Sequence, residues 1–141
     1  MAEESIPGIH SILIVDDDVH LSDLLQKRLA SLGLDVGVVH TASEALAASA
    51  ERSHNLYLMD IRVPGKNGVE LAKELLAAHP RSRVIFMTAY EPEDLFRRMP
   101  EMAGWTLLTK PFKMVSIHEE IVKLLEYGGP NTRVRRKNVR T

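Results

Sequence analysis

Five short apolar runs, each followed by an amphipathic segment, dominate the pattern of this chain. The runs are four or five residues long and rich in leucine, isoleucine, valine and methionine, which is typical of strands buried on both faces. They cover residues 12–15, 36–40, 56–60, 84–88 and 105–109. Apolar positions then recur every three or four residues, which is the spacing of an amphipathic helix. The pattern predicts five strands alternating with five helices.

Local signals mark the ends of the expected helices. Gly33 should stop the first helix, and Pro80 limits the third. Residues 41–44 and 116–119 match capping boxes, which predicts that helices two and five begin there. The fourth helix should end or kink early, because Pro100 follows its apolar positions.

The alternation of strands and helices predicts a single doubly wound α/β fold, of the (βα)5 flavodoxin-like type. Such a fold has a five-stranded parallel sheet with right-handed crossovers and helices on both faces. The expected strand order is 2-1-3-4-5, which places strands one and three side by side at the topological switch point. Ligands bind at the carboxyl ends of the strands at such a point. We therefore expect the functional site there.

Length and composition indicate one globular domain with two flanking segments. A chain of 141 residues suits one hydrophobic core, and the charged fraction of 26% is ordinary for a soluble protein. We expect a flexible N-terminal lead at residues 1–10, the folded domain at 11–127, and a basic tail or linker at 128–141. The tail lacks apolar periodicity, which predicts disorder.

Several functional classes are excluded or disfavoured by composition. The chain has no cysteine, which excludes disulfides and thiolate metal sites. It shows no signal peptide and no apolar run near the ~20 residues that span a bilayer, so we expect a cytoplasmic protein without a membrane partner. Five basic residues in the tail leave the rest of the chain with 13 basic against 19 acidic residues, a net charge of −6. The basic residues of the tail could contact nucleic-acid phosphates, but no motif supports sequence-specific binding. A linker or plain tail is the favoured interpretation.

Polar side chains follow four of the five expected strands. They are Asp16, Asp17 and Asp18 after the first strand, Asp60 at the end of the third, Thr88 at the end of the fourth and Lys110 after the fifth. In the expected sheet these groups surround one crevice. Carboxylates without thiolates suit Mg²⁺ or Mn²⁺, and a metal, a lysine and a hydroxyl together can hold a transferring phosphoryl group. Asp60 is the best candidate nucleophile, since it stands alone on the central strand, whereas Asp18 suits a helix N-cap.

Four stretches of the chain resemble the receiver domain of two-component response regulators. They are residues 12–18, 58–68, 87–90 and 108–112, and the resemblance spans roughly residues 11–127. It implies that Asp60 is the phosphoacceptor and that Thr88 and Lys110 contact the phosphoryl oxygens. The implied metal ligands are Asp16, Asp17, Asp60 and the backbone carbonyl of Arg62. The peptide before Pro111 is usually cis in this family.

The chain departs from the family pattern at Leu107, where the family usually has an aromatic residue three positions before the lysine. In the family that ring moves inward when the threonine engages the phosphate. This chain therefore lacks the ring of the usual coupling, whereas it keeps the residues of the phosphorylation chemistry. Trp105 should point to the same sheet face as Leu107, because side chains alternate along a strand.

The resemblance implies a signalling module that is not a conventional enzyme but catalyses its own phosphorylation and dephosphorylation. Its expected partners are a histidine kinase or histidine phosphotransfer protein, a downstream protein target or an output domain absent from this chain, and a homodimer is left open. One alternative is a receiver-like scaffold that works without phosphorylation. A second is an aspartate-nucleophile phosphatase, suggested by the spacing of Asp16 and Asp18 but opposed by His20 and by the absence of acids between Lys110 and Glu119.

Overall fold

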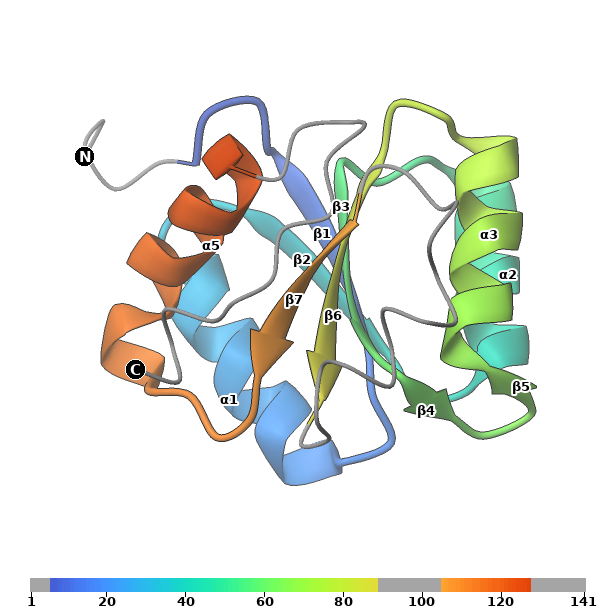
Figure 1. Ribbon diagram of the computed structural model, residues 1–141, viewed down its shortest axis with the longest axis horizontal. Helices are drawn as coiled ribbons and strands as arrows, with labels where there is room; N and C mark the ends of the chain where they lie inside the picture. Colours follow the sequence, from blue (N-terminus) through green and yellow to red (C-terminus); the bar gives the residue numbers. More distant parts are fainter. Residues whose placement is uncertain (1–5, 89–104, 128–141) are drawn as a thin grey trace.

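The fold is a five-stranded parallel sheet with helices on both faces (Figure 1). The computed structural model describes residues 6–88 and 105–127. The strands of the sheet are β1 (Ser11–Val15), β2 (Asp35–Val39), β3 (Leu56–Asp60), β6 (Arg83–Thr88) and β7 (Trp105–Thr109). Their order is β2-β1-β3-β6-β7, and every neighbouring pair is parallel. This is the order expected for a doubly wound flavodoxin-like sheet, so the predicted fold is confirmed.

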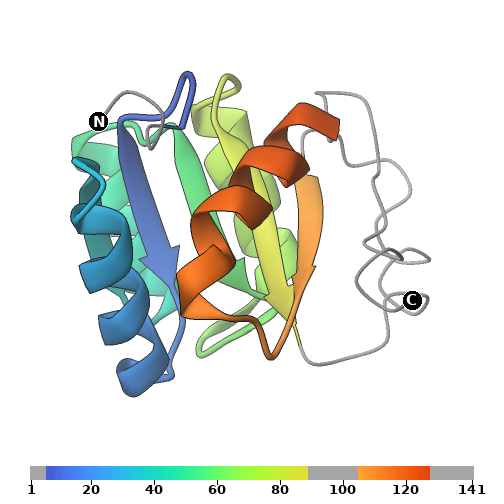
Figure 2. The same ribbon diagram turned by 90° about the vertical axis from the view of Figure 1, so that its left-hand side faces the viewer.

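The helices lie in two layers, one on each face of the sheet. They are α1 (Val19–Ala30), α2 (Ala42–Glu51), α3 (Gly68–Ala78) and α5 (Ile117–Tyr127), with a 3-10 turn, η2 (Met114–Ser116), directly before α5. Figures 1 and 2 show α1 and α5 on one face and α2 and α3 on the other. All five strands of the sheet point the same way.

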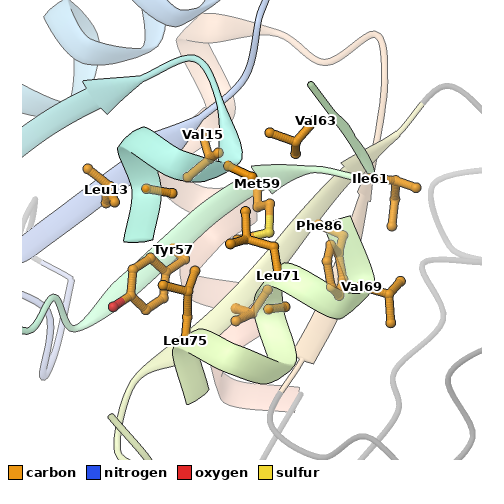
Figure 3. Packing of buried hydrophobic residues seen from close by; sticks show 14 of the residues in the cluster. Leu13, Val15, Tyr57, Met59, Ile61, Val63, Val69, Leu71, Leu75 and Phe86 are labelled. Carbon is orange, nitrogen blue, oxygen red and sulfur yellow. The ribbon is translucent and has the colours of Figure 1, made fainter. Parts of the chain in front are cut away.

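The two faces of the sheet carry two hydrophobic clusters, because side chains alternate along each strand. On the face covered by α2 and α3, Tyr57, Met59 and Phe86 pack toward Leu71 and Leu75 of α3 (Figure 3). On the other face, Ile12, Ile14, Leu58 and Ile85 pack with residues of α1 and α5. The middle strands are buried on both sides, which explains their uninterrupted apolar sequences.

Side-chain caps fix the starts of α1 and α2. Asp18 caps α1 by accepting from the Leu21 N–H at 3.0 Å, as predicted. Thr41 caps α2 by accepting from the Glu44 N–H at 3.2 Å. The Glu44 carboxylate in turn accepts a hydrogen bond from the His40 N–H. α5 begins at Ile117, where the capping box at 116–119 predicted a helix start. Ser116 lies in the 3-10 turn, where its hydroxyl approaches the Lys113 carbonyl at 3.4 Å.

The N-terminal segment differs from the expected flexible lead. Ile6 and Ile9 are only 2% and 6% exposed, and both belong to the cluster beneath α1 and α5. The side chain of Asn55 holds this segment, because its oxygen accepts from the N–H groups of His10 and Ser11. The folded body therefore includes Ile6 and Ile9.

Two further regions complete the comparison with the expected elements. The connection between β3 and α3 forms a short hairpin, β4 (Arg62–Val63) and β5 (Lys66–Asn67), with Gly65 at φ 96° in its turn. The expected fourth helix, the side chain of Trp105 and the basic tail lie outside the described residues.

Candidate functional site

Three of the predicted site residues meet at the carboxyl edge of the sheet. Asp16 follows β1, Asp60 is the last residue of β3, and Lys110 follows β7. The Lys110 Nζ lies 3.1 Å from Asp16 Oδ2 and 2.7 Å from Asp60 Oδ2. The lysine therefore bridges two carboxylates that are 44 residues apart in the chain. The fold brings them together because parallel strands deliver their carboxyl ends to one edge.

Backbone N–H groups hold the remaining oxygen of each carboxylate. Asp16 Oδ1 accepts from the Asp18 N–H at 2.9 Å, and Asp60 Oδ1 accepts from the Arg62 N–H at 2.8 Å. The two carboxylates differ in access, since the Asp16 side chain is 0% exposed and the Asp60 side chain is 17% exposed. Both are fixed in orientation, but only Asp60 of this bridged pair can be reached from solvent.

The charges of the site are strongly coupled. Burial raises the pKa of Asp16, and the hydrogen bond from the Asp18 N–H and the charge of Lys110 offset this only in part. Burial also lowers the pKa of Lys110, but its hydrogen bond to Asp60 and the charges of Asp60 and Asp16 more than reverse this, so its pKa is raised. Lys110 is therefore an ammonium at neutral pH. A further cation here would favour the buried Asp16 charge.

Thr88 and Lys110 are joined through the backbone at the ends of β6 and β7. Thr88 is buried, and its carbonyl oxygen accepts from the Lys110 N–H at 2.7 Å. The Lys110–Pro111 peptide is cis, as the family resemblance implied. Leu107 is 0% exposed and packs in the cluster beneath α2 and α3. At this position the chain thus has a fully buried aliphatic side chain where an aromatic ring would be usual.

The oxygen donors of this edge suit a hard divalent cation. Asp17 is exposed on the turn after Asp16, and the candidate set of three carboxylates and the Arg62 carbonyl contains oxygen only. Across residues 6–88 and 105–127, no group of three or more His, Asp or Glu side chains is preformed as a metal cage. Mg²⁺ does not require one, since it usually takes one or two carboxylates and keeps several waters. The donor set therefore fits Mg²⁺ or Mn²⁺.

His40 is a neighbour of the site that the sequence pattern did not single out. It follows β2, and its ring Nδ1 lies 2.8 Å from the carbonyl oxygen of Asp16. The predicted strand order contains the signal that would have found it, because β2 lies beside β1 and both strands end at this edge.

The opposite, amino edge of the sheet carries a second set of polar residues. His79 Nε2 lies 2.9 Å from the Ser49 carbonyl, and the Ser49 hydroxyl lies 3.3 Å from that of Tyr57. His54 is 7% exposed, and its ring lies beside that of Tyr57. His54 and His79 line a cavity of about 450 Å³ that none of the predicted site residues lines.

Comparison with known proteins agrees with this geometry. The family model described as the response regulator receiver domain matches residues 12–122. Sporulation initiation phosphotransferase F of Bacillus subtilis is 31% identical over 114 residues, which are 81% of this chain and 92% of that protein. The DNA-binding transcriptional regulator NtrC of Salmonella typhimurium is 34% identical over 115 residues, which are 82% of this chain but 24% of that protein. The chain thus spans about a quarter of the length of such regulators.

A solved structure supports the same comparison. The CheY-like response regulator receiver domain protein of Methanospirillum hungatei has a TM-score of 0.73 and 30% identity, covering 84% of this chain and 94% of that one. A separate check of the described residues finds no helix with the length and apolar character needed to cross a membrane.

Proposed function

This chain belongs to the response regulator receiver domain family of two-component systems, and we propose that it receives a phosphoryl group on Asp60 and thereby changes how it binds a partner. The observation that supports the assignment is that the Asp60 carboxylate lies 2.7 Å from the Lys110 ammonium and is still partly exposed to solvent. Receiver domains are signalling modules, so the chemistry serves switching rather than turnover of a metabolite.

Access and charge select Asp60 among the carboxylates of the edge. Asp16 contacts the same lysine, but its side chain is fully buried and out of reach of a phosphoryl donor. Asp17 is exposed, but within the described residues its carboxylate has no contact with a cation. Asp60 alone among these three combines contact with Lys110 and access to solvent, which are the two requirements of a nucleophile that must meet an anionic donor.

The proposed reaction transfers a phosphoryl group from a phosphorylated histidine. A carboxylate oxygen of Asp60 attacks the phosphorus, a new O–P bond forms, and the P–N bond of the donor breaks. The departing imidazole takes a proton from solvent, and Asp60 becomes an acyl phosphate. Lys110 neutralises the charge of the phosphoryl oxygens, and the Thr88 hydroxyl donates to one of them; transfer of this kind depends mainly on positioning and on electrostatic stabilisation.

A divalent cation belongs to this proposal as a ligand of the same edge. Asp16, Asp17, Asp60 and the Arg62 carbonyl would hold Mg²⁺ or Mn²⁺. Bound there, the metal would offset the mutual repulsion of the carboxylates and the incoming phosphoryl oxygens. Partner switching then follows if the phosphorylated site stabilises the state in which Thr88 and Lys110 engage the phosphoryl group.

The partners of the proposed module are a histidine kinase or histidine phosphotransfer protein on the donor side and a protein target or output domain on the other. Leu107 favours a second candidate, a scaffold that binds its partner without phosphorylation, because a buried leucine lacks the ring that usually reports the state of the threonine. The complete set of Asp16, Asp60 and Lys110 contacts favours the phosphorylated module over that scaffold.

The proposal is tested by the intact mass of the protein after incubation with acetyl phosphate and Mg²⁺. We expect a phosphoryl adduct that disappears when the metal is chelated. Asp60→Asn should form none, because its amide is not nucleophilic. Asp23→Asn is the matched control, since Asp23 is an exposed aspartate of α1 that pairs with Lys27 at 3.7 Å. This variant should be phosphorylated normally.

Two outcomes would count against the module. An adduct of equal size on Asp60→Asn would place the acceptor elsewhere. No adduct with acetyl phosphate, followed by none with a phosphorylated histidine phosphotransfer protein, would favour the scaffold.

A further inference from the structure

His40 contacts the peptide group that joins Asp16 to Asp17. Its ring Nδ1 lies 2.8 Å from the Asp16 carbonyl oxygen. A carbonyl oxygen only accepts hydrogen bonds, so Nδ1 carries the hydrogen and donates it. The contact crosses from β2 to β1 at the carboxyl edge of the sheet, which is the edge that holds the acidic site.

No other contact in the described part of the chain holds this carbonyl as closely. The Ser22 hydroxyl is 3.4 Å from it, which is long for a hydroxyl donor, and its shorter bond of 2.8 Å goes to the Asp18 carbonyl. The N–H of Asp16 donates to the Val39 carbonyl at 3.2 Å. Asp16 is therefore tied to the end of β2 on both sides, once through Val39 and once through His40.

The orientation of this peptide matters most for Asp17. A peptide group is planar, so fixing the Asp16 carbonyl also fixes the direction in which the Asp17 Cα leaves the strand. Asp17 is exposed, and its carboxylate makes no hydrogen bond or ion pair with residues 6–88 or 105–127. Asp16 differs, because the Asp18 N–H and Lys110 hold its side chain directly. The position of Asp17 thus depends on its backbone.

His40 is itself held in place by the start of α2. Its N–H donates to Glu44 Oε1 at 2.8 Å, and the Glu44 N–H donates to the Thr41 hydroxyl at 3.2 Å. The cap of α2 and the turn that carries Asp17 are therefore linked through one histidine. This link is part of the folded structure and does not need a bound ligand.

We propose that His40 is a positioning residue, whose bond to the Asp16 carbonyl orients Asp17 and so raises the affinity of the acidic site for Mg²⁺ or Mn²⁺. The inference rests on the proposed function, which assigns a divalent cation to this site. Groups that orient metal ligands typically change metal affinity about 10–100-fold when they are removed. We expect about a tenfold loss, at the lower end, because His40 acts through the backbone.

The direct test is a titration with Mn²⁺, in which electron paramagnetic resonance measures the free ion. His40→Ala should raise the dissociation constant about tenfold relative to the wild type. His40→Asn should recover most of the affinity, because its amide N–H can occupy the place of Nδ1. In phosphorylation by acetyl phosphate, His40→Ala should need about ten times more Mg²⁺ for half the maximal rate and should reach the same rate at saturation.

His79→Ala provides a matched control on the same chain. His79 makes the same kind of bond, from Nε2 to the Ser49 carbonyl at 2.9 Å, but at the amino edge of the sheet. Loss of that bond should lower the thermal midpoint as much as His40→Ala does and leave the affinity for Mn²⁺ unchanged. A merely structural role of His40 would make the two variants alike in both measurements.

Two results would overturn the inference while the metal site stands. The first is that the wild type and His40→Ala bind Mn²⁺ with equal affinity. The second is that His40→Ala and His40→Asn lose equal amounts of Mn²⁺ affinity. In each case Asp17→Asn must bind Mn²⁺ clearly more weakly than the wild type. Failure of the proposed metal site is distinguishable, because the wild type would then bind Mn²⁺ no better than Asp17→Asn. That result would overturn both proposals.

Discussion

The two edges of the sheet satisfy their polar groups in opposite ways. At the amino edge, the Asn55 side chain accepts from two backbone N–H groups, and the Ser82 hydroxyl donates to the His54 carbonyl. These partners are neutral, and the Asp35–Arg52 ion pair at the same edge is exposed to solvent. At the carboxyl edge, two carboxylates, Asp16 and Asp60, share a single lysine. Burial there raises the pKa of Asp16, which shows that its charge is held at a cost.

This difference indicates that the amino edge stabilises the fold and that the carboxyl edge serves function. Neutral side chains that satisfy the backbone stabilise the folded state, because their removal leaves backbone groups without partners. Neighbouring carboxylates with little exposure to solvent do not stabilise the folded state. Proteins keep such groups where a bound ligand, such as a cation, will neutralise them. We therefore expect changes at the amino edge to cost stability and changes of charge at the carboxyl edge to cost function.

The largest effect on stability should come from the backbone contact behind Asp60. A Cβ added to Gly68, the first residue of α3, would clash with the Ile61 carbonyl oxygen and lie 2.7 Å from that of Asp60. Neither atom can move without moving the strand end. Gly68→Ala should lower the free energy of unfolding by about 3 kcal/mol in urea denaturation and slow phosphorylation of what remains folded.

Gly37→Ala is the control for this contact. A Cβ added there would meet only the flexible Leu13 side chain, at 3.3 Å. Its cost should be below about 1 kcal/mol. Equal losses in the free energy of unfolding for the two substitutions would show that the start of α3 does not lie as close to the end of β3 as described.

The next largest effect should be a loss of stability at the amino edge without a loss of function at the carboxyl edge. Asn55→Ala removes the acceptor of the His10 and Ser11 N–H groups, at 2.7 and 2.9 Å. It should lower the free energy of unfolding by about 2 kcal/mol, because these groups lose their partner. Phosphorylation of the folded protein should keep its rate. A large loss of that rate at full folding would mean that the two edges are coupled.

Removing charge at the carboxyl edge should have the opposite profile. Asp16→Asn keeps the oxygen that accepts from the Asp18 N–H and removes a buried charge, while Lys110 retains Asp60. The metal-free variant should be as stable as the wild type or up to roughly 1 kcal/mol more stable, yet bind Mn²⁺ poorly. Asp35→Asn, which removes an exposed partner of Arg52, should keep its metal affinity. A marked loss of stability in Asp16→Asn would contradict the comparison.

The smallest effect concerns pH at the amino edge. Burial lowers the pKa of His54, and the charge of Arg52 lowers it further. The unfolded chain therefore takes up a proton near pH 6.5, and the folded protein only at lower pH. Stability contributed by neutral His54 is present above pH 6.5 and is lost as pH falls toward the lowered value.

This slope can be measured as the free energy of unfolding between about pH 7.5 and 5.5. The slope should be shallower in His54→Gln than in the wild type. A wild-type slope in His54→Gln would show that His54 does not titrate as described.

Repeated local signals made most of the carboxyl edge predictable. Asp16, Asp60 and Lys110 each end an apolar run, and parallel strands must bring such ends together. The contacts between them needed no further information than the strand order. The residues that the pattern missed depend on pairings across the sheet. His40 contacts Asp16 only because β2 lies beside β1.

The amino edge was less predictable for the same reason. Ile6 and Ile9 have no periodic neighbours, so their burial depends on a surface formed by α1 and α5. His54 stands alone in a polar segment before β3, and only the fold places its ring beside Tyr57. Single polar residues carry no periodicity, so their burial must be learned from tertiary structure.

The measurement that tests the central claim most directly is the position of the acyl phosphate. After incubation with acetyl phosphate and Mg²⁺, reduction with borohydride converts an aspartyl phosphate into homoserine, which tandem mass spectrometry locates in the peptides. The account predicts homoserine in place of Asp60, with Asp16 and Asp17 unchanged. Homoserine in place of Asp16 or Asp17, with Asp60 intact, would contradict it.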